Sequence, residues 1–117
     1  MDHLDEKACK SAGMAVRDTL DIINGKWKLL ILLTLYKGGK RRFRELSKEI
    51  NISPRVLSRE LQELEMNKLV SRTVCDTRPV IIEYNITPYC ETLTPVITAM
   101  VEWGEQHRAE ILGKKVS

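Results

Sequence analysis

Four polar side chains stand at helical spacing in the segment that follows Ser53-Pro54. They are Arg55, Ser58, Arg59 and Gln62, at positions i, i+3, i+4 and i+7 of one helix face. Guanidinium, hydroxyl and amide groups hydrogen-bond base edges and phosphates. The acidic residues of this segment begin only at Glu60, so its N-terminal half carries no carboxylate. The pattern favours contact with a nucleic acid, and an ordinary solvated polar face is the alternative.

Basic residues are concentrated in the middle third of the chain. The 117 residues include 19 basic and 16 acidic ones, a net charge of +3. Residues 26–59 carry ten basic and two acidic side chains, or +8, whereas residues 1–25 sum to −2 and residues 60–117 to −3. A basic block is typical of proteins that bind polyanions, although a solvated basic surface has the same composition.

Residue types that carry catalysis or bind metals are scattered. Cys9, Cys75 and Cys90 form no Cys-x-x-Cys pair, and histidines occur only near the two ends, so we expect neither a metal site nor another cofactor. The glycine–lysine pair at 25–26 lacks the earlier glycine and the following Ser or Thr of a phosphate loop. We find no Ser/Cys–His–acid set, and we predict that the protein is not an enzyme.

Length and composition predict one domain over residues 1–117. The chain is 43% hydrophobic and 30% charged, which is typical of a globular protein. Its longest apolar run, Leu29–Leu33, is too short to span a bilayer, and its acidic N-terminus lacks the apolar stretch of a signal peptide. We therefore expect a cytoplasmic protein without a membrane partner.

Hydrophobic periodicity and turn residues predict the elements that position the polar face. We expect helices over residues 13–24, 26–36, 42–50 and 53–67, hairpin strands over 70–75 and 80–86, and a last helix over 88–112. Ser53-Pro54 and Thr87-Pro88 each combine a capping side chain with a proline suited to a first helical turn. Trp27, Phe43 and Tyr84 lie among apolar neighbours and are expected in the core.

Two short helices over 42–67 followed by a hairpin over 70–86 predict a winged helix-turn-helix, a mainly α fold with a small β-hairpin. In this fold the second helix of the pair enters the major groove of DNA. The predicted DNA contacts are therefore Ser53 and the four residues of the polar face, with Arg41 and Arg42 on phosphates beside Lys40 and Arg44. Arg78, next to Pro79 at the hairpin tip, is a further predicted contact.

Several motifs together resemble the HxlR family of bacterial winged-helix transcriptional regulators. They are Gly25-Lys26-Trp27-Lys28, Arg42-Phe43-x-Glu45-Leu46, Ile52-Ser53-Pro54-Arg55-x-Leu57-Ser58-x-x-Leu61, Glu83-Tyr84-x-Ile86-Thr87 and Trp103-Gly104-x-x-His107. The resemblance implies a homodimer, joined through the first and last helices, that binds a roughly palindromic operator. In the hairpin, Ile81 stands where the family usually has an arginine, and Arg78 on the other side of the proline is a candidate substitute.

The last helix is longer than a lone winged helix needs, which also favours a dimer. We expect the helices over 13–24 and 88–112 to form the interface, through Leu20, Leu93, Ile97, Met100 and His107. A winged helix that binds only proteins is the alternative function. The sequence is compatible with a small-molecule effector but identifies none.

Cys9 lies just before the first predicted helix, where many members of the family have a cysteine that in some of them senses oxidants. Lys7 and Lys10 flank it, and nearby cations favour a reactive thiolate. Cys9 is therefore a candidate redox sensor, with Cys75 and Cys90 as candidate resolving thiols. Its alternative role is a small packing residue of the N-terminal segment.

Overall fold

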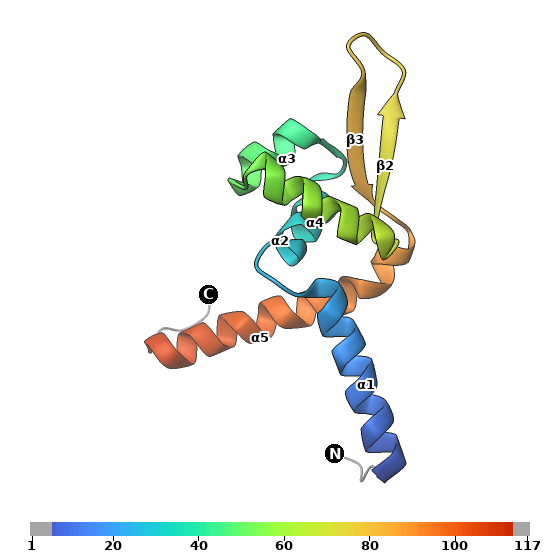
Figure 1. Cartoon of the computed structure of the whole chain (residues 1–117). Coiled ribbons are helices and arrows are strands. Elements are labelled where there is room, and N and C mark those ends of the chain that lie inside the picture. Colours follow the sequence, from blue (N-terminus) through green and yellow to red (C-terminus); the bar gives the residue numbers. More distant parts are fainter. Residues whose placement is uncertain (1–5, 114–117) are drawn as a thin grey trace.

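Residues 6–113 are described by a computed structural model, in which five α-helices, one 3₁₀ helix and three strands follow one another (Figure 1). Their order is α1 (Glu6–Ile23), α2 (Lys28–Gly38), β1 (Arg41–Arg42), α3 (Phe43–Ile50), α4 (Pro54–Met66), β2 (Val70–Cys75), β3 (Ile81–Ile86), η1 (Tyr89–Leu93) and α5 (Thr94–Leu112). The predicted winged helix-turn-helix is confirmed. Within the described residues, no helix combines the length and the apolar composition needed to cross a membrane.

The predicted hairpin belongs to a three-stranded antiparallel sheet of order β1-β3-β2. Val70 pairs with Ile86 and Cys75 with Ile81, so β2 and β3 form the wing. Arg41 and Arg42 pair with Tyr84 and Glu83 as the additional strand β1. Strand β1 was not predicted, because its two residues are too few to show an alternating pattern.

Helices α2, α3 and α4 pack together at the base of the wing and enclose the hydrophobic core (Figure 1). The side chains with at most 1% exposure are Ile31, Leu32, Leu35, Leu46, Leu57, Leu61 and Leu64. Tyr84 is buried as predicted, and Trp27 and Phe43 pack against the core from partly buried positions. The apolar stripe of α4 thus faces inward, which turns its polar face outward.

Most helices begin and end close to the predicted positions, at glycine or capping residues. Gly25 and Gly39 have φ values of +84° and +79°, a region that favours glycine, and α1 and α2 end beside them. The Ser53 hydroxyl accepts a hydrogen bond from the Val56 N–H at 3.3 Å, which caps α4.

The first and last helices differ from the predicted ranges. Helix α1 begins at Glu6, seven residues before the predicted start, because Gly13 weakens a helix without ending it. The predicted helix over 88–112 is divided into η1 and α5. Pro95 has no N–H to donate and its ring clashes with the carbonyl of residue 91, which disfavours an α-helix that continues through it from η1.

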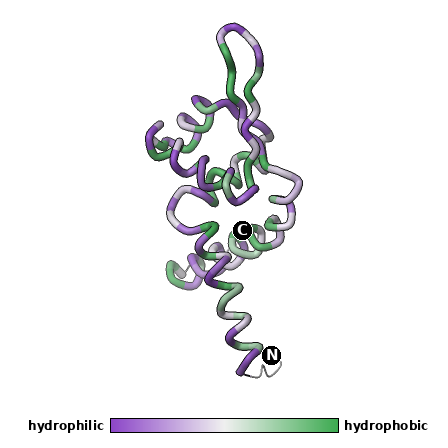
Figure 2. Tube along the Cα trace, turned by 45° about the vertical axis from the view of Figure 1, so that its right-hand side comes forward, coloured by the Kyte–Doolittle hydropathy of each residue, from purple (hydrophilic) through white to green (hydrophobic). Residues whose placement is uncertain are grey.

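Helices α1 and α5 project from the body as two arms (Figure 1). Ile23 is the only described residue of α1 that is buried, and no described residue of α5 is. Hydrophobic segments nevertheless continue along α1 and into the wing (Figure 2). The radius of gyration is 17.3 Å, whereas a compact chain of this length would have about 13 Å. The arms therefore carry apolar surface that this chain does not cover.

An ion pair is buried where α2 meets α4. The Lys28 ammonium lies 2.5 Å from a Glu60 carboxylate oxygen and also contacts the Glu63 carboxylate, while the Lys28 and Glu60 side chains are 5% and 8% exposed. Asn24 Oδ1 accepts a longer hydrogen bond from Lys28 at 3.5 Å. Lys28, one of the ten basic residues of the block over 26–59, is therefore not available to a polyanion.

The pKa values of this cluster reflect its pairing. Burial alone would lower the pKa of Lys28, but hydrogen bonds and charges from Glu60 and Glu63 outweigh it, so the Lys28 pKa is raised. The hydrogen bond from Lys28 and its charge lower the pKa of Glu63. The contribution of Glu63 to stability is therefore complete above its unfolded pKa and is lost as the pH falls through its lowered folded pKa. The contribution of Lys28 is lost only as the pH rises through its raised pKa.

Replacing Lys28 by methionine is expected to lower the free energy of unfolding by about 3–5 kcal/mol, because Glu60 would remain buried without its counter-charge. The measurement is urea unfolding followed by circular dichroism at one fixed protein concentration. Lys26→Met is the control for loss of an exposed lysine; it removes only the cation–π contact of Lys26 with the Trp27 ring and should lower stability by at most about 1 kcal/mol. The double variant Lys28→Met/Glu60→Leu should regain most of the loss. Equal stability of Lys28→Met and Lys26→Met would contradict the structural role of the pair.

Candidate nucleic-acid interface

The polar face of α4 is exposed over its whole length. Arg55, Ser58, Arg59 and Gln62 are all accessible, as their spacing predicted. Arg59 is 66% exposed, with one guanidinium nitrogen 3.9 Å from a Glu60 oxygen. Because Glu60 turns inward to Lys28, the exposed N-terminal half of α4 is free of outward carboxylates.

The turn between α3 and α4 sets the direction of this face. Asn51 adopts the left-handed conformation, with φ 59° and ψ 51°, and ends α3. The Ser47 hydroxyl donates to the Ile52 carbonyl at 2.8 Å, and Ile52 is buried in the core. Ser53 then caps α4, so its hydroxyl is engaged with the backbone while its side chain remains at the exposed start of the helix.

Arg41 differs from the other predicted DNA contacts. Its side chain is only 20% exposed and its guanidinium is already engaged, donating to Glu49 Oε1 at 2.7 Å and to the carbonyls of Gly38, Gly39 and Lys40. A side chain at Gly38 would overlap this guanidinium. Arg41 therefore braces the loop between α2 and α3, a role that a charge count cannot distinguish from phosphate binding.

Arg42 has a different environment from its neighbour. Its side chain is exposed, and its backbone N–H donates to Glu45 Oε1 at 2.8 Å at the start of α3. Arg44 and Lys48 on α3 are also exposed. The structure thus leaves cationic side chains of α3 beside the polar face of α4.

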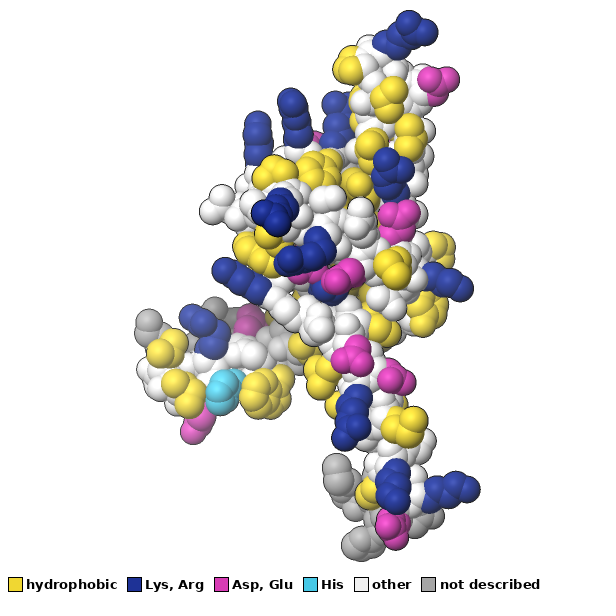
Figure 3. Space-filling model, viewed as in Figure 1, with side chains coloured by type: hydrophobic (Ala, Val, Ile, Leu, Met, Phe, Trp, Pro, Cys, Tyr) yellow, Lys and Arg dark blue, Asp and Glu magenta, His cyan; other side chains and the backbone are white. Residues whose placement is uncertain are grey.

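The wing adds two exposed arginines. Arg78 lies in the loop between β2 and β3, at the projecting end of the hairpin (Figure 1). Arg72 on β2 is also exposed and was not among the predicted contacts. It pairs with Tyr84, and residues 71–74 are all exposed, so strand alternation alone does not place it outward. Lys and Arg side chains gather on the body and at the wing tip in Figure 3, whereas the arms are mixed. The exposed cations of α3, α4 and the wing are therefore accessible to a polyanionic partner.

The three cysteines occupy unequal environments. Cys9 is exposed on α1. Cys75 donates a hydrogen bond to Glu83 Oε1 at 3.2 Å, and this contact, with burial and the Glu83 charge, raises its pKa. Burial, with the charge of Glu91, raises the pKa of Cys90. Cys75 and Cys90 are therefore deprotonated less readily than an ordinary cysteine. Among residues 6–113, no three metal-binding side chains lie close enough together to hold a metal ion.

Known proteins are similar to this chain in sequence and in fold. A sequence model of the HxlR-like helix-turn-helix family matches residues 22–111. YdeP of Bacillus subtilis, an HTH-type transcriptional regulator, is 42% identical over 100 residues, which cover 85% of this chain and 77% of YdeP. An HTH-type transcriptional regulator of Methanothermobacter thermautotrophicus is 40% identical over 104 residues, covering 88% and 75% of the two chains.

Solved structures of other proteins are also similar to this chain. The reduced form of the redox regulator HypR matches with a TM-score of 0.78 and 37% identity, covering 85% of this chain and 98% of that one. The reduced form of the transcriptional regulator YodB from B. subtilis matches with a TM-score of 0.69 and 32% identity, covering 77% of this chain and 88% of that one. The relatives are transcriptional regulators and not enzymes.

Proposed function

The chain belongs to the HxlR-like helix-turn-helix family of transcriptional regulators, and we propose that it binds double-stranded DNA as a homodimer on a roughly palindromic operator. The observation that carries the proposal is the exposed face of Arg55, Ser58, Arg59 and Gln62 on α4, from which the core ion pair removes the Glu60 carboxylate. A helix with this face enters the major groove, where arginine and amide groups read base edges.

Other exposed cations support the same orientation on DNA. Arg42 and Arg44 lie at the start of α3, the helix that in this fold crosses the DNA backbone. Arg72 and Arg78 on the wing suit phosphate or minor-groove contacts. A winged helix that binds only proteins would not need cations on all three elements.

The DNA test begins by selecting bound duplexes from a random pool, and a palindromic consensus is expected. On that duplex, Arg59→Ala should weaken binding by about 1–3 kcal/mol and relax the preference at one position if Arg59 reads a base. If Arg59 contacts only phosphate, all duplexes should weaken alike and the salt dependence should become shallower. Arg108→Ala on α5 is the matched control for loss of one exposed charge, with unchanged affinity.

The double variant Arg55→Ala/Arg59→Ala decides the assignment of the α4 face. Unchanged affinity of this variant would remove α4 from the DNA interface. Failure of the unaltered protein to bind duplex DNA with a salt-dependent affinity would favour the protein-binding alternative.

The arms carry the dimer part of the proposal. The accessible surface is 9219 Å², against roughly 6,500 Å² for a compact monomer of this mass. On α5, Val96, Met100 and Trp103 are 40%, 44% and 64% exposed along one side, and His107 stacks on Trp103 with ring centroids 4.8 Å apart. On α1, Leu20 is 55% exposed. A second copy would cover these faces with equivalent ones.

The other two predicted interface residues have a different position. Leu93 and Ile97 are half-buried and pack against the core of their own chain. Substituting either would disturb folding as well as association, so residues on the outer stripe give the clearer test.

Met100→Glu is expected to convert the dimer into a monomer, because it places an unpaired charge within the apolar contact. The measurement is the mass in solution by light scattering at micromolar concentration. Met66→Glu is the matched control, since Met66 is 81% exposed on α4 outside the arms, and it should remain dimeric. A monomeric wild-type protein under these conditions would refute the dimer.

We also propose that Cys9 makes operator binding sensitive to oxidants. The similar protein HypR is a redox regulator with solved reduced and oxidised forms. Cys9 is exposed on α1, an arm of the proposed dimer, whereas the environments of Cys75 and Cys90 raise their pKa values. Oxidation on this arm would alter the spacing of the two α4 helices without a contact to DNA.

Diamide, which converts two thiols to one disulfide, is expected to change the operator affinity of the wild type and not that of Cys9→Ser. Cys75→Ser should respond as the wild type does if the second thiol of that disulfide is Cys90 or the Cys9 of a second copy, and should lose the response if Cys75 is the resolving thiol. Affinity is measured by titration before and after diamide and again after dithiothreitol. Equal responses of wild type and Cys9→Ser would return Cys9 to a packing role.

A further inference from the structure

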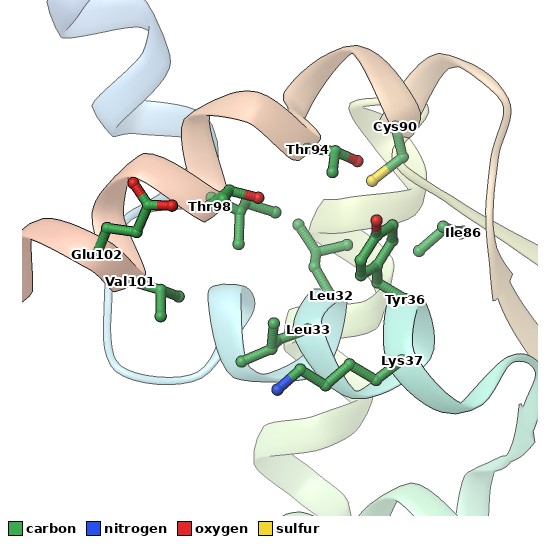
Figure 4. Close-up of a pocket in the computed structure, with 11 residues that line it drawn as sticks. Leu32, Leu33, Tyr36, Lys37, Ile86, Cys90, Thr94, Thr98, Val101 and Glu102 are labelled. Carbon is green, nitrogen blue, oxygen red and sulfur yellow. The ribbon is translucent and has the colours of Figure 1, made fainter. Parts of the chain in front are cut away.

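A pocket of about 300 Å³ lies between α2 and the segment formed by η1 and α5 (Figure 4). Its apolar walls include Leu32 and Leu33 of α2, Ile86 at the end of β3, and Ile97 and Val101 of α5. This volume is at the lower end of the range of small-molecule sites, which are mostly apolar with a few placed polar groups. The pocket joins the DNA-binding body to one of the arms.

Three hydroxyl groups line this pocket, those of Tyr36, Thr94 and Thr98 (Figure 4). Other helical threonines of the chain use their hydroxyls locally: Thr19, Thr34 and Thr92 each donate to a carbonyl three or four residues earlier, at 2.7–2.8 Å. Within residues 6–113, the three pocket hydroxyls donate to no protein acceptor, so they are available to a ligand.

The charges at the pocket favour a neutral ligand. Its two charged residues, Lys37 and Glu102, have opposite signs, so the site offers no net charge to an anion or a cation. Cys90 also lines the pocket, but it is 3% exposed and its raised pKa keeps it a thiol, which favours reversible over covalent binding.

The pocket is separate from the proposed dimer contact. At 100° per residue, Thr94, Ile97, Thr98 and Val101 share one side of α5, and the stripe of Val96, Met100, Trp103 and His107 lies on nearly the opposite side. A second copy seated on the outer stripe would leave the pocket side of α5 facing its own body.

We propose that this pocket is an effector site for a compact, uncharged, mainly apolar molecule that carries a hydrogen-bond-accepting oxygen such as a ketone, ester or lactone carbonyl. The hydroxyls of Tyr36 and Thr98 donate to that oxygen, and the apolar walls enclose the rest. A ligand there contacts α2 and α5 together and so fixes the angle between body and arm. This regulatory role rests on the proposed binding of DNA by a dimer.

Acetophenone is the probe for the site, with ethylbenzene as its counterpart without an acceptor and benzoate as its charged counterpart. Binding to the full-length protein is followed by amide chemical shifts in NMR titrations. We expect saturable shifts in α2 and α5 with acetophenone, at an affinity at least threefold higher than for either counterpart. Tyr36→Phe and Thr98→Val should each weaken acetophenone about threefold to tenfold.

Thr92→Val is the matched control, because the Thr92 hydroxyl is bonded to the Tyr89 carbonyl and Thr92 does not line the pocket. It should bind acetophenone as the wild type does. Thr98→Phe, at an exposed position on the pocket edge, should fill the pocket and abolish the shifts. Equal binding of the three compounds, or acetophenone binding unaffected by both hydroxyl variants, would overturn the site.

The effector role is measured on the operator duplex with and without saturating acetophenone. A change in DNA affinity that Thr98→Phe removes supports it, and an unchanged affinity overturns it. The titrations without DNA report on the pocket alone, and DNA binding without acetophenone reports on the proposed function alone, so the two failures are distinguishable.

Discussion

The ammonium of Lys28, buried between α2 and α4, is the contact on which the geometry of this protein depends. The apolar stripe of Leu57, Leu61 and Leu64 already turns the polar face of α4 outward. Helix α2 is apolar on nearly every side, and hydrophobic contact is non-directional, so that contact alone fixes the exact rotation of α4 only loosely. A buried charge must find its counter-charge, and Lys28 meets Glu60 and Glu63, three residues apart on one side of α4. This pairing requires one rotation of α4, in which Arg55, Ser58, Arg59 and Gln62 face outward.

The same contact changes the electrostatics of the exposed face. Glu60 lies next to Arg59 in the sequence, and an outward Glu60 would repel phosphate beside the arginine. Because Lys28 holds Glu60 in the interior, the pairing removes one positive and one negative charge from the surface. Arg41 is withdrawn in a similar way by Glu49 and the carbonyls of the loop after α2. The cations that remain exposed are thus fewer than the sequence contains, but they include those on α3, α4 and the wing.

The arms have a different organisation from the body. Helix α5 has two dissimilar sides, one with hydroxyls and apolar side chains turned to α2 and one with a continuous apolar stripe turned away. A helix with apolar residues on both sides is stable only when two partners cover it. In this chain the body provides one of them, and the dimer we propose provides the other. Such a helix links the state of the body to the geometry of the assembly.

The sequence by itself determined the order and type of nearly all elements and the outward face of α4. Those features depend on local chemistry: the period of Leu57, Leu61 and Leu64, the Ser53 cap, and the glycines after α1 and α2. Only the tertiary structure decided which charges are internal, since Lys28 and Glu60 are 32 residues apart and resemble any surface pair in the sequence. It also decided that β1 joins the sheet and that three hydroxyls line one pocket. Burial and pairing arise between segments distant in the chain, and periodicity describes only one segment at a time.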